Sequence, residues 1–114
     1  GDYHMVPQAS LGIVRIMLNQ DPQVNFCRPA ADPMFVALAG IYRNSLLGVV
    51  LTGMGSDGKN GAQVIVENGG TVIAQDEATS VVWGMPRAVA NANICAEVLP
   101  LDDVGVYISK ALKG

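Results

Sequence analysis

The spacing of apolar residues changes along the chain, and the changes predict alternating strands and helices. Weak two-residue alternation over 3–18, interrupted at 8–12, predicts two short strands joined by a turn. Turn-forming residues dominate 19–31. Asp32 followed by Pro33 then predicts a helix N-cap and a first helical residue. The apolar residues Met34, Leu38 and Ile41 fall on one face, which predicts a helix to about Arg43.

Beyond residue 45, short apolar runs alternate with amphipathic segments. Runs without internal alternation are typical of strands buried on both faces of a parallel sheet. The expected strands are 46–51, 71–74 and 97–99, and the expected helices run from the glycine-rich turn 52–58 to residue 67, over 86–92, and onward from residues 102–103. This order is typical of a doubly wound α/β fold. We therefore expect a Rossmann-like, three-layer α/β architecture with a mostly parallel sheet, preceded by an N-terminal hairpin.

Composition and charge exclude several classes of function. Half of the 114 residues are hydrophobic and 15% are charged, which fits one small domain with a core. The net charge of −3, without a Lys/Arg cluster, argues against a nucleic-acid partner. The chain contains no uninterrupted run of 18 apolar residues, so we expect no membrane insertion. Cys27 and Cys95 fit neither a metal-ligand spacing nor a disulfide framework, so we expect two reduced thiols and no metal.

The glycine-rich turn allows more than one function. Residues 53–58 have the spacing G-x-G-x-x-G between a strand and a helix, and Asp76 and Glu77 follow the next strand, as in a dinucleotide-binding fingerprint. Asp57 opposes this interpretation, because a carboxylate at a helix N-terminus repels a pyrophosphate and can occupy its N–H donors. The residues alone leave three possibilities open: nucleotide binding through the Gly53–Gly58 turn, a structural turn, or a catalytic carboxylate.

Five segments carry a further signal in their residues and in their order. They are 48–58 (GVVLTGMGSDG), 69–78 (GGTVIAQDEA), 81–87 (VVWGMPR), 1–5 (GDYHM) and, more loosely, 28–32 (RPAAD). In this order and spacing they resemble the chemotaxis protein-glutamate methylesterases, the CheB family. In that family a doubly wound domain hydrolyses glutamate methyl esters of receptors with a Ser-His-Asp triad.

The resemblance implies that Asp57 is the triad carboxylate, with no cofactor and no metal. The family's nucleophile lies in a G-A-S-T-G-G turn and its base in a Q-H-M-P turn, and neither motif occurs in this chain. We therefore expect residues 1–114 to be the C-terminal portion of a catalytic domain, inactive by itself. Glutamine deamidation is a second activity that the resemblance allows.

The resemblance also implies partners and a location. The substrate would be the methylated cytoplasmic domains of chemoreceptors, and the location would be the cytoplasm. The other partners would be an N-terminal receiver domain and the upstream half of the catalytic domain. A doubly wound sheet without its first strand–helix units has an uncovered edge and uncovered faces, so we expect self-association.

Four other residues invite a chemical role. His4 is the only histidine, and we expect it at the rim of the site or in a structural role rather than as the base. We expect Ser56 to cap a helix or to face solvent rather than to act as a nucleophile. We do not expect Cys27 to act as a nucleophile, because the sequence offers it no partner histidine. For Arg87 we expect a solvated surface position.

Overall fold

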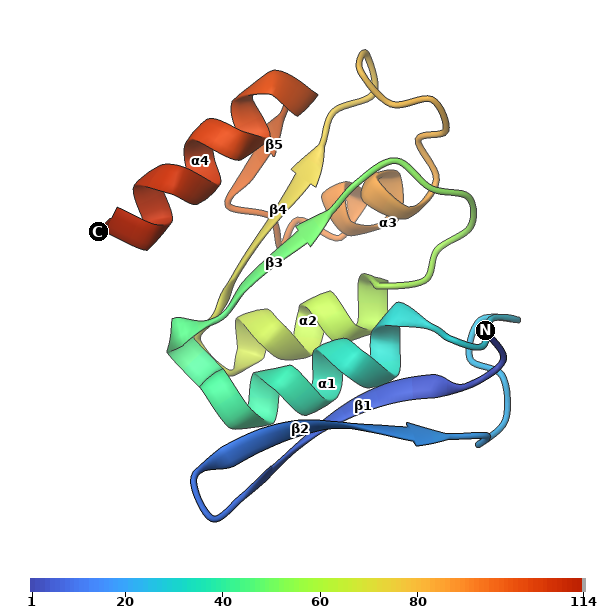
Figure 1. The fold of residues 1–114 in the computed structure, drawn as a ribbon. Helices are drawn as coiled ribbons and strands as arrows, with labels where there is room; N and C mark the ends of the chain where they lie inside the picture. Colours follow the sequence, from blue (N-terminus) through green and yellow to red (C-terminus); the bar gives the residue numbers. More distant parts are fainter. Residues whose placement is uncertain (114) are drawn as a thin grey trace.

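The computed structural model describes residues 1–113, within which the strands form two sheets (Figure 1). The antiparallel hairpin consists of β1 (His4–Ser10) and β2 (Ile13–Asn19), and the parallel sheet has the order β3 (Leu47–Val50), β4 (Thr71–Gln75), β5 (Glu97–Leu99). The helices are α1 (Ala31–Tyr42), α2 (Lys59–Glu67), α3 (Met85–Asn91) and α4 (Leu101–Lys113), with a 3-10 turn at Arg43–Ser45. The expected α/β class is confirmed.

Alternate residues of β3 face different helices, so the sheet is the middle one of three layers. A Cβ atom on Gly48 would lie 3.0 Å from Ile65 Cδ1, so this side of β3 packs against α2. Leu47 and Val49 point to the opposite face, where they line a groove of about 500 Å³ together with Tyr107 of α4. Figure 1 shows α4 on one side of the strands and α2 and α3 on the other.

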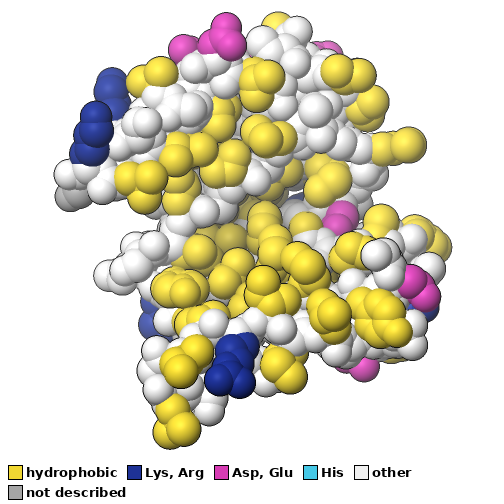
Figure 2. Space-filling model, in the orientation of Figure 1, with side chains coloured by type: hydrophobic (Ala, Val, Ile, Leu, Met, Phe, Trp, Pro, Cys, Tyr) yellow, Lys and Arg dark blue, Asp and Glu magenta, His cyan; other side chains and the backbone are white. Residues whose placement is uncertain are grey.

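The core lies between the parallel sheet and the helices on the α2 side. It is built from small and β-branched side chains, in keeping with the low aromatic content. Its fully buried members are Ala39, Val50, Ala62, Ile65, Val72, Ala74 and Val89. Hydrophobic side chains also reach the surface, and Figure 2 shows them gathered across the middle of one face, between α4 and the layer of α1.

Helix α1 lies between the hairpin and α2 (Figure 1). Helices α1 and α2 approach each other closely because α2 has a glycine, Gly61, at the contact. A Cβ atom on Gly61 would lie 2.5 Å from Phe35 Cβ and 3.1 Å from Asp32 Cα. This close approach brings the start of α1 next to the start of α2.

Two predicted boundaries are wrong. Strand β1 does not break at residues 8–12, because the hairpin turn is only Leu11–Gly12, with both residues at positive φ (52° and 77°). Helix α1 begins at Ala31, with Ala30 as its N-cap, so Asp32 is not the cap of this helix. The Asp32 carboxylate binds α2 instead, as described below. Within residues 1–113, every helix is too short or too polar to cross a membrane.

Candidate functional site

Asp57 lies in the loop that connects the carboxyl end of β3 to α2. Figure 1 shows that this loop reaches the start of α1, whose first residues contact the Asp57 carboxylate. The residue is only 7% exposed. Its carboxylate accepts the backbone N–H of Ala31 through Oδ2, and those of Asp32 (3.2 Å) and Gly58 (3.0 Å) through Oδ1. The sequence places this buried carboxylate correctly at a helix N-terminus, but its donors belong mainly to α1 and not to α2.

The start of α1 is a favourable environment for a negative charge. Its first N–H groups have no partner within the helix, and the helix dipole concentrates positive potential there. Asp57 satisfies two of these N–H groups from a loop 25 residues further along the chain. Helix α2 begins differently, since its N-cap is Gly58 at φ 98° without a side-chain cap. The carboxylate is therefore held in one place by fixed backbone donors.

Asp32 makes the complementary contact in the other direction. Its Oδ1 accepts the N–H of Gly61 in the first turn of α2 at 2.7 Å. Asp32 is 6% exposed, so this hydrogen bond is shielded from water. Asp57, which precedes α2, thus binds backbone N–H groups at the start of α1. Asp32, which belongs to α1, binds a backbone N–H group at the start of α2.

Asn25 joins the two carboxylates. Its Nδ2 donates to Asp32 Oδ2 at 2.7 Å and to Asp57 Oδ1 at 3.0 Å. A primary amide has two N–H donors, so both are used. Sequence reasoning missed Asn25. The one local signal is that asparagine tolerates the positive φ of tight turns, and this signal says nothing about its side-chain partners.

The glycine-rich loop is tied to the segment that precedes α3. The Gly53 N–H donates to the Val82 carbonyl at 3.0 Å, and the Gly53 carbonyl accepts the N–H groups of Gly84 (3.1 Å) and Met85 (2.9 Å). A Cβ atom on Gly84 would lie 2.8 Å from the Gly53 oxygen, so only glycine fits there without movement of the backbone. The sequence motifs 48–58 and 81–87 therefore meet at one edge of the sheet.

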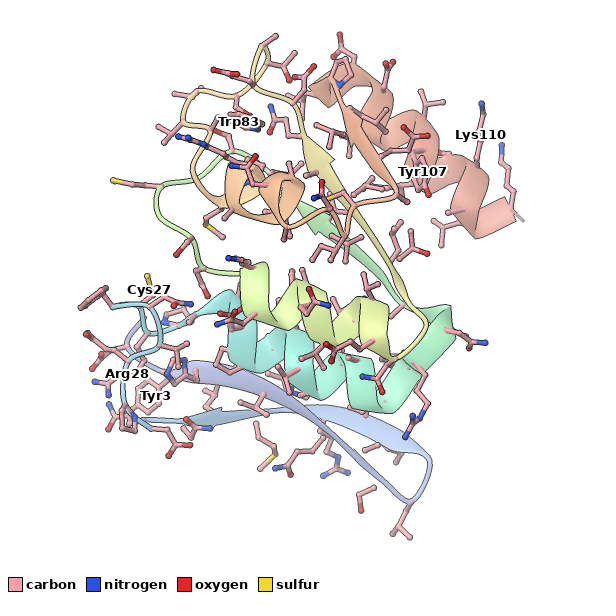
Figure 3. All side chains as sticks on the ribbon, turned by 180° about the vertical axis from the view of Figure 1, so that it is seen from behind. Tyr3, Cys27, Arg28, Trp83, Tyr107 and Lys110 are labelled. Atoms are coloured by element: carbon pink, nitrogen blue, oxygen red, sulfur yellow. The ribbon has the colours of Figure 1, made fainter. Side chains whose placement is uncertain are left out.

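A buried glutamine and a tryptophan support this loop from β4. Gln75, 1% exposed, accepts the N–H of Thr52 at 2.8 Å through its side-chain oxygen. The indole N–H of Trp83 donates to the Gln75 carbonyl at 3.1 Å. Figure 3 shows Trp83 beside the end of β4.

The other candidate residues do not gather around Asp57. Ser56 is exposed to solvent, one of the two positions expected for it. His4 is 2% exposed in β1, with Nε2 3.0 Å from the Pro22 carbonyl oxygen, which supports a structural role. Arg87 is exposed, as expected. Within residues 1–113, neither His4 nor Ser56 makes a side-chain hydrogen bond to Asp57.

The two cysteines are free and lie in different environments. Cys27 is exposed, and Figure 3 places it beside Arg28 near the N-terminal end of the molecule. Cys95 is partly buried, and this burial raises the pKa of its thiol. In the part of the chain that the structure describes, no three His, Cys, Asp or Glu side chains are grouped so that they could hold a metal ion.

The geometry is unfavourable for a pyrophosphate at the start of α2. The Gly61 N–H is taken by Asp32, and the Lys59 N–H is directed at the Ser56 carbonyl (3.4 Å). Two carboxylates, those of Asp32 and Asp57, occupy the space beside these donors. A dinucleotide would therefore meet negative charge where it needs free N–H groups.

Comparison with known proteins gives a consistent result. The family model described as CheB methylesterase matches residues 1–108. The protein-glutamate methylesterase/protein-glutamine glutaminase 2 of Caulobacter vibrioides is 60% identical over 110 residues, which are 96% of this chain and 32% of that protein. A similarly named protein of Rhodospirillum rubrum is 54% identical over 112 residues, 97% of this chain and 29% of that protein.

The fold matches as well. The crystal structure of the Thermotoga maritima CheB methylesterase catalytic domain superposes with a TM-score of 0.92 at 38% identity, covering 99% of this chain and 58% of that one. The chain spans about a third of the length of the curated relatives it matches. The dinucleotide-binding alternative finds no support in these comparisons, and this chain belongs to the CheB methylesterase family.

Proposed function

We propose that this chain is the C-terminal portion of a protein-glutamate methylesterase catalytic domain, and that Asp57 is the carboxylate of its Ser-His-Asp triad. The observation that carries the proposal is the buried Asp57 carboxylate, fixed by backbone N–H groups at the start of α1. A triad carboxylate has to be immobile, because it orients an imidazole whose other nitrogen must reach the nucleophile.

The reaction would be acyl transfer in two steps. A serine hydroxyl attacks the ester carbonyl of a methylated glutamate, while a histidine takes the serine proton and passes it to the departing methanol. Water then cleaves the acyl-enzyme by the same route and releases the glutamate carboxylate. Both groups would come from the upstream half of the domain. Asp57 holds the histidine in the productive tautomer and stabilises the imidazolium that forms in each step.

The substrates follow from this assignment. We expect methylated glutamates in the cytoplasmic domains of chemoreceptors, and hence a cytoplasmic location, with an N-terminal receiver domain as the regulatory partner. Glutamine side chains can undergo the same acyl transfer with ammonia as the leaving group. The two relatives named above carry both activities in their names.

A chimera tests the proposal without the natural upstream sequence. In the Caulobacter vibrioides relative, the matching 110-residue segment is replaced by the one from this chain. Methanol release from a methylated receptor fragment is then measured for the chimera and for its Asp57→Asn and Ser56→Ala variants. Ser56 is the matched control, because it adjoins Asp57 and is exposed.

We expect an active chimera, a strong loss of kcat with Asp57→Asn, and an unchanged kcat with Ser56→Ala. A folded Asp57→Asn chimera with kcat within twofold of the parent would show that Asp57 is not the triad carboxylate. An Asp57→Ala variant serves as the second test, because it removes the carboxylate without introducing an amide donor.

A further inference from the structure

We propose that Asn25 is a positioning residue for Asp57, and that Oδ2 is the Asp57 oxygen that receives the triad histidine. This inference rests on the proposed function. It begins from the bridge described above, in which one amide group contacts Asp32 at 2.7 Å and Asp57 at 3.0 Å.

The backbone around Asn25 holds its side chain in place. Val24 and Cys27 exchange two N–H···O bonds, of 3.0 and 2.9 Å, around a turn whose central residues are Asn25 (φ 52°) and Phe26 (φ 64°). Positive φ at both central residues is typical of a type I′ turn, which favours glycine at its second position. Phe26 at that position is unusual, so this turn does not have the sequence that is best for local stability.

The loop that carries this turn is anchored on both sides. Arg28 bonds the Asp2 carboxylate at 2.8 Å, and its guanidinium also donates to the Gln20 carbonyl at 3.2 Å. The Asp2 N–H returns a bond to the Arg28 carbonyl at 3.2 Å. Figure 3 shows Arg28 and Cys27 together at this end of the molecule. Asn25 therefore extends from a fastened loop.

The chemistry of the bridge suits an amide. Two buried carboxylates repel each other, and a neutral donor between them offsets the repulsion without adding a charge. The contacts also close a ring, because the Asp32 N–H donates to Asp57 while both side chains accept from Asn25. In such a ring, no carboxylate can rotate without losing a hydrogen bond.

The distribution of donors distinguishes the two oxygens of Asp57. Oδ1 accepts from Asn25, Asp32 and Gly58, while within residues 1–113 Oδ2 accepts only from Ala31. A carboxylate oxygen has two lone pairs, so Oδ1 is fully engaged and Oδ2 keeps one acceptor position. The N–H of an imidazole would bind there.

The test uses the active chimera and the variant Asn25→Gly. Glycine suits φ 52°, so the turn keeps its conformation while the amide is lost. We expect kcat to fall about tenfold, as for loss of a hydrogen bond to a charged group, with KM within twofold. Phe26→Gly is the matched control: it changes the same turn at a residue that is 96% exposed, and its kcat should equal that of the parent.

A double variant separates positioning from a merely structural role. If Asn25 acts through Asp57, Asn25→Gly causes no further loss of kcat in the Asp57→Asn background. Asn25→Asp, which keeps the shape and the turn but has no donor, should lose at least as much kcat as Asn25→Gly. Either of these two Asn25 variants, if folded, gives the answer when the other does not fold.

Each result has a separate meaning. A folded Asn25→Gly chimera with the parent's kcat, or equal losses from Asn25→Gly with and without Asp57→Asn, would overturn the positioning inference while leaving Asp57 in the triad. A folded Asp57→Asn chimera with the parent's kcat would instead overturn the proposed function, on which this inference depends.

Discussion

Asp32 and Asp57 bind the starts of two neighbouring helices in opposite directions. The Asp57 carboxylate accepts the N–H of Asp32 at 3.2 Å, at the beginning of α1, and the Asp32 carboxylate accepts the N–H of Gly61 at 2.7 Å, at the beginning of α2. Both side chains are buried, and Asn25 donates to both. The candidate catalytic carboxylate is therefore also part of the packing between two helices.

Replacing Asp57 with asparagine should reduce stability as well as activity. Both carboxylate oxygens face N–H donors, so an amide group in place of either one sets a donor against a donor. We expect the free energy of unfolding of the chimera to fall by about 1–3 kcal/mol. We expect kcat to fall about 10–10³-fold, since the charge that supports the imidazolium is lost. Urea unfolding and methanol release measure the two effects, and an unchanged urea midpoint would contradict the hydrogen-bond assignment.

Asp32→Asn should destabilise the protein through α2. Each Asp32 oxygen accepts one hydrogen bond, from Gly61 and from Asn25, and an amide can replace only one acceptor. We expect a loss of about 1–3 kcal/mol in the free energy of unfolding and faster hydrogen exchange at the Gly61 amide. Asp103→Asn, at an exposed position in the first turn of α4, is the control and should change stability little. Protection of Gly61 equal to that of the parent would rule out this contact.

Two glycine-to-alanine changes should have opposite signs. At Gly61 a Cβ atom would overlap Phe35 Cβ, at 2.5 Å, so Gly61→Ala should separate α1 from α2 and destabilise the protein by about 1–3 kcal/mol. Gly40, in α1, has open space around its Cβ position, so Gly40→Ala should stabilise the helix by about 0.5–1 kcal/mol. Thermal unfolding of both variants tests this, and a Gly61→Ala variant as stable as the parent would contradict the close helix contact.

The isolated 114-residue chain should associate with itself. Strand β3 is an edge strand within the described residues, and Leu47 and Val49 line the open groove under α4. An uncovered strand edge beside an apolar groove favours pairing with a second chain. We expect the chain to sediment faster than a monomer. Val49→Lys should slow its sedimentation more than the control Val106→Lys, which changes an exposed position of α4. Monomeric sedimentation of the unsubstituted chain, with its secondary structure intact by circular dichroism, would contradict this.

The two thiols should react with iodoacetamide at different rates. The thiolate is the reactive form, and burial raises the pKa of Cys95, so less of it is ionised at any pH below that pKa. Cys27 is exposed and should be alkylated first at pH 8. Mass spectrometry of a time course gives both rates, and faster alkylation of Cys95 in the folded chain would be the opposite of what its burial implies.

Much of the fold is predictable because the signals are local. The strand expected over 97–99 coincides with β5, and β3, β4, α3 and α4 start or end within about two residues of expectation. The end of α2 at Glu67 also depends on neighbouring residues, Asn68–Gly70. Gly69 has φ 89°, and the Gly70 N–H donates to the Ile65 carbonyl at 2.9 Å, the pattern that ends a helix in a left-handed residue.

The sequence by itself determined the order of strands and helices, the family to which the chain belongs, and the carboxylate to examine, because each depends on residues close together in the chain. Only the tertiary structure decided what that carboxylate touches. Asn25 and Asp57 are 32 positions apart, and Asp32 reads locally as the cap of its own helix although it bonds α2. Local patterns cannot reveal such exchanged contacts, because the contacts depend on how closely α1 and α2 pack. Gly61 allows this close packing, but the residues near Gly61 in the sequence do not indicate that α1 will lie there.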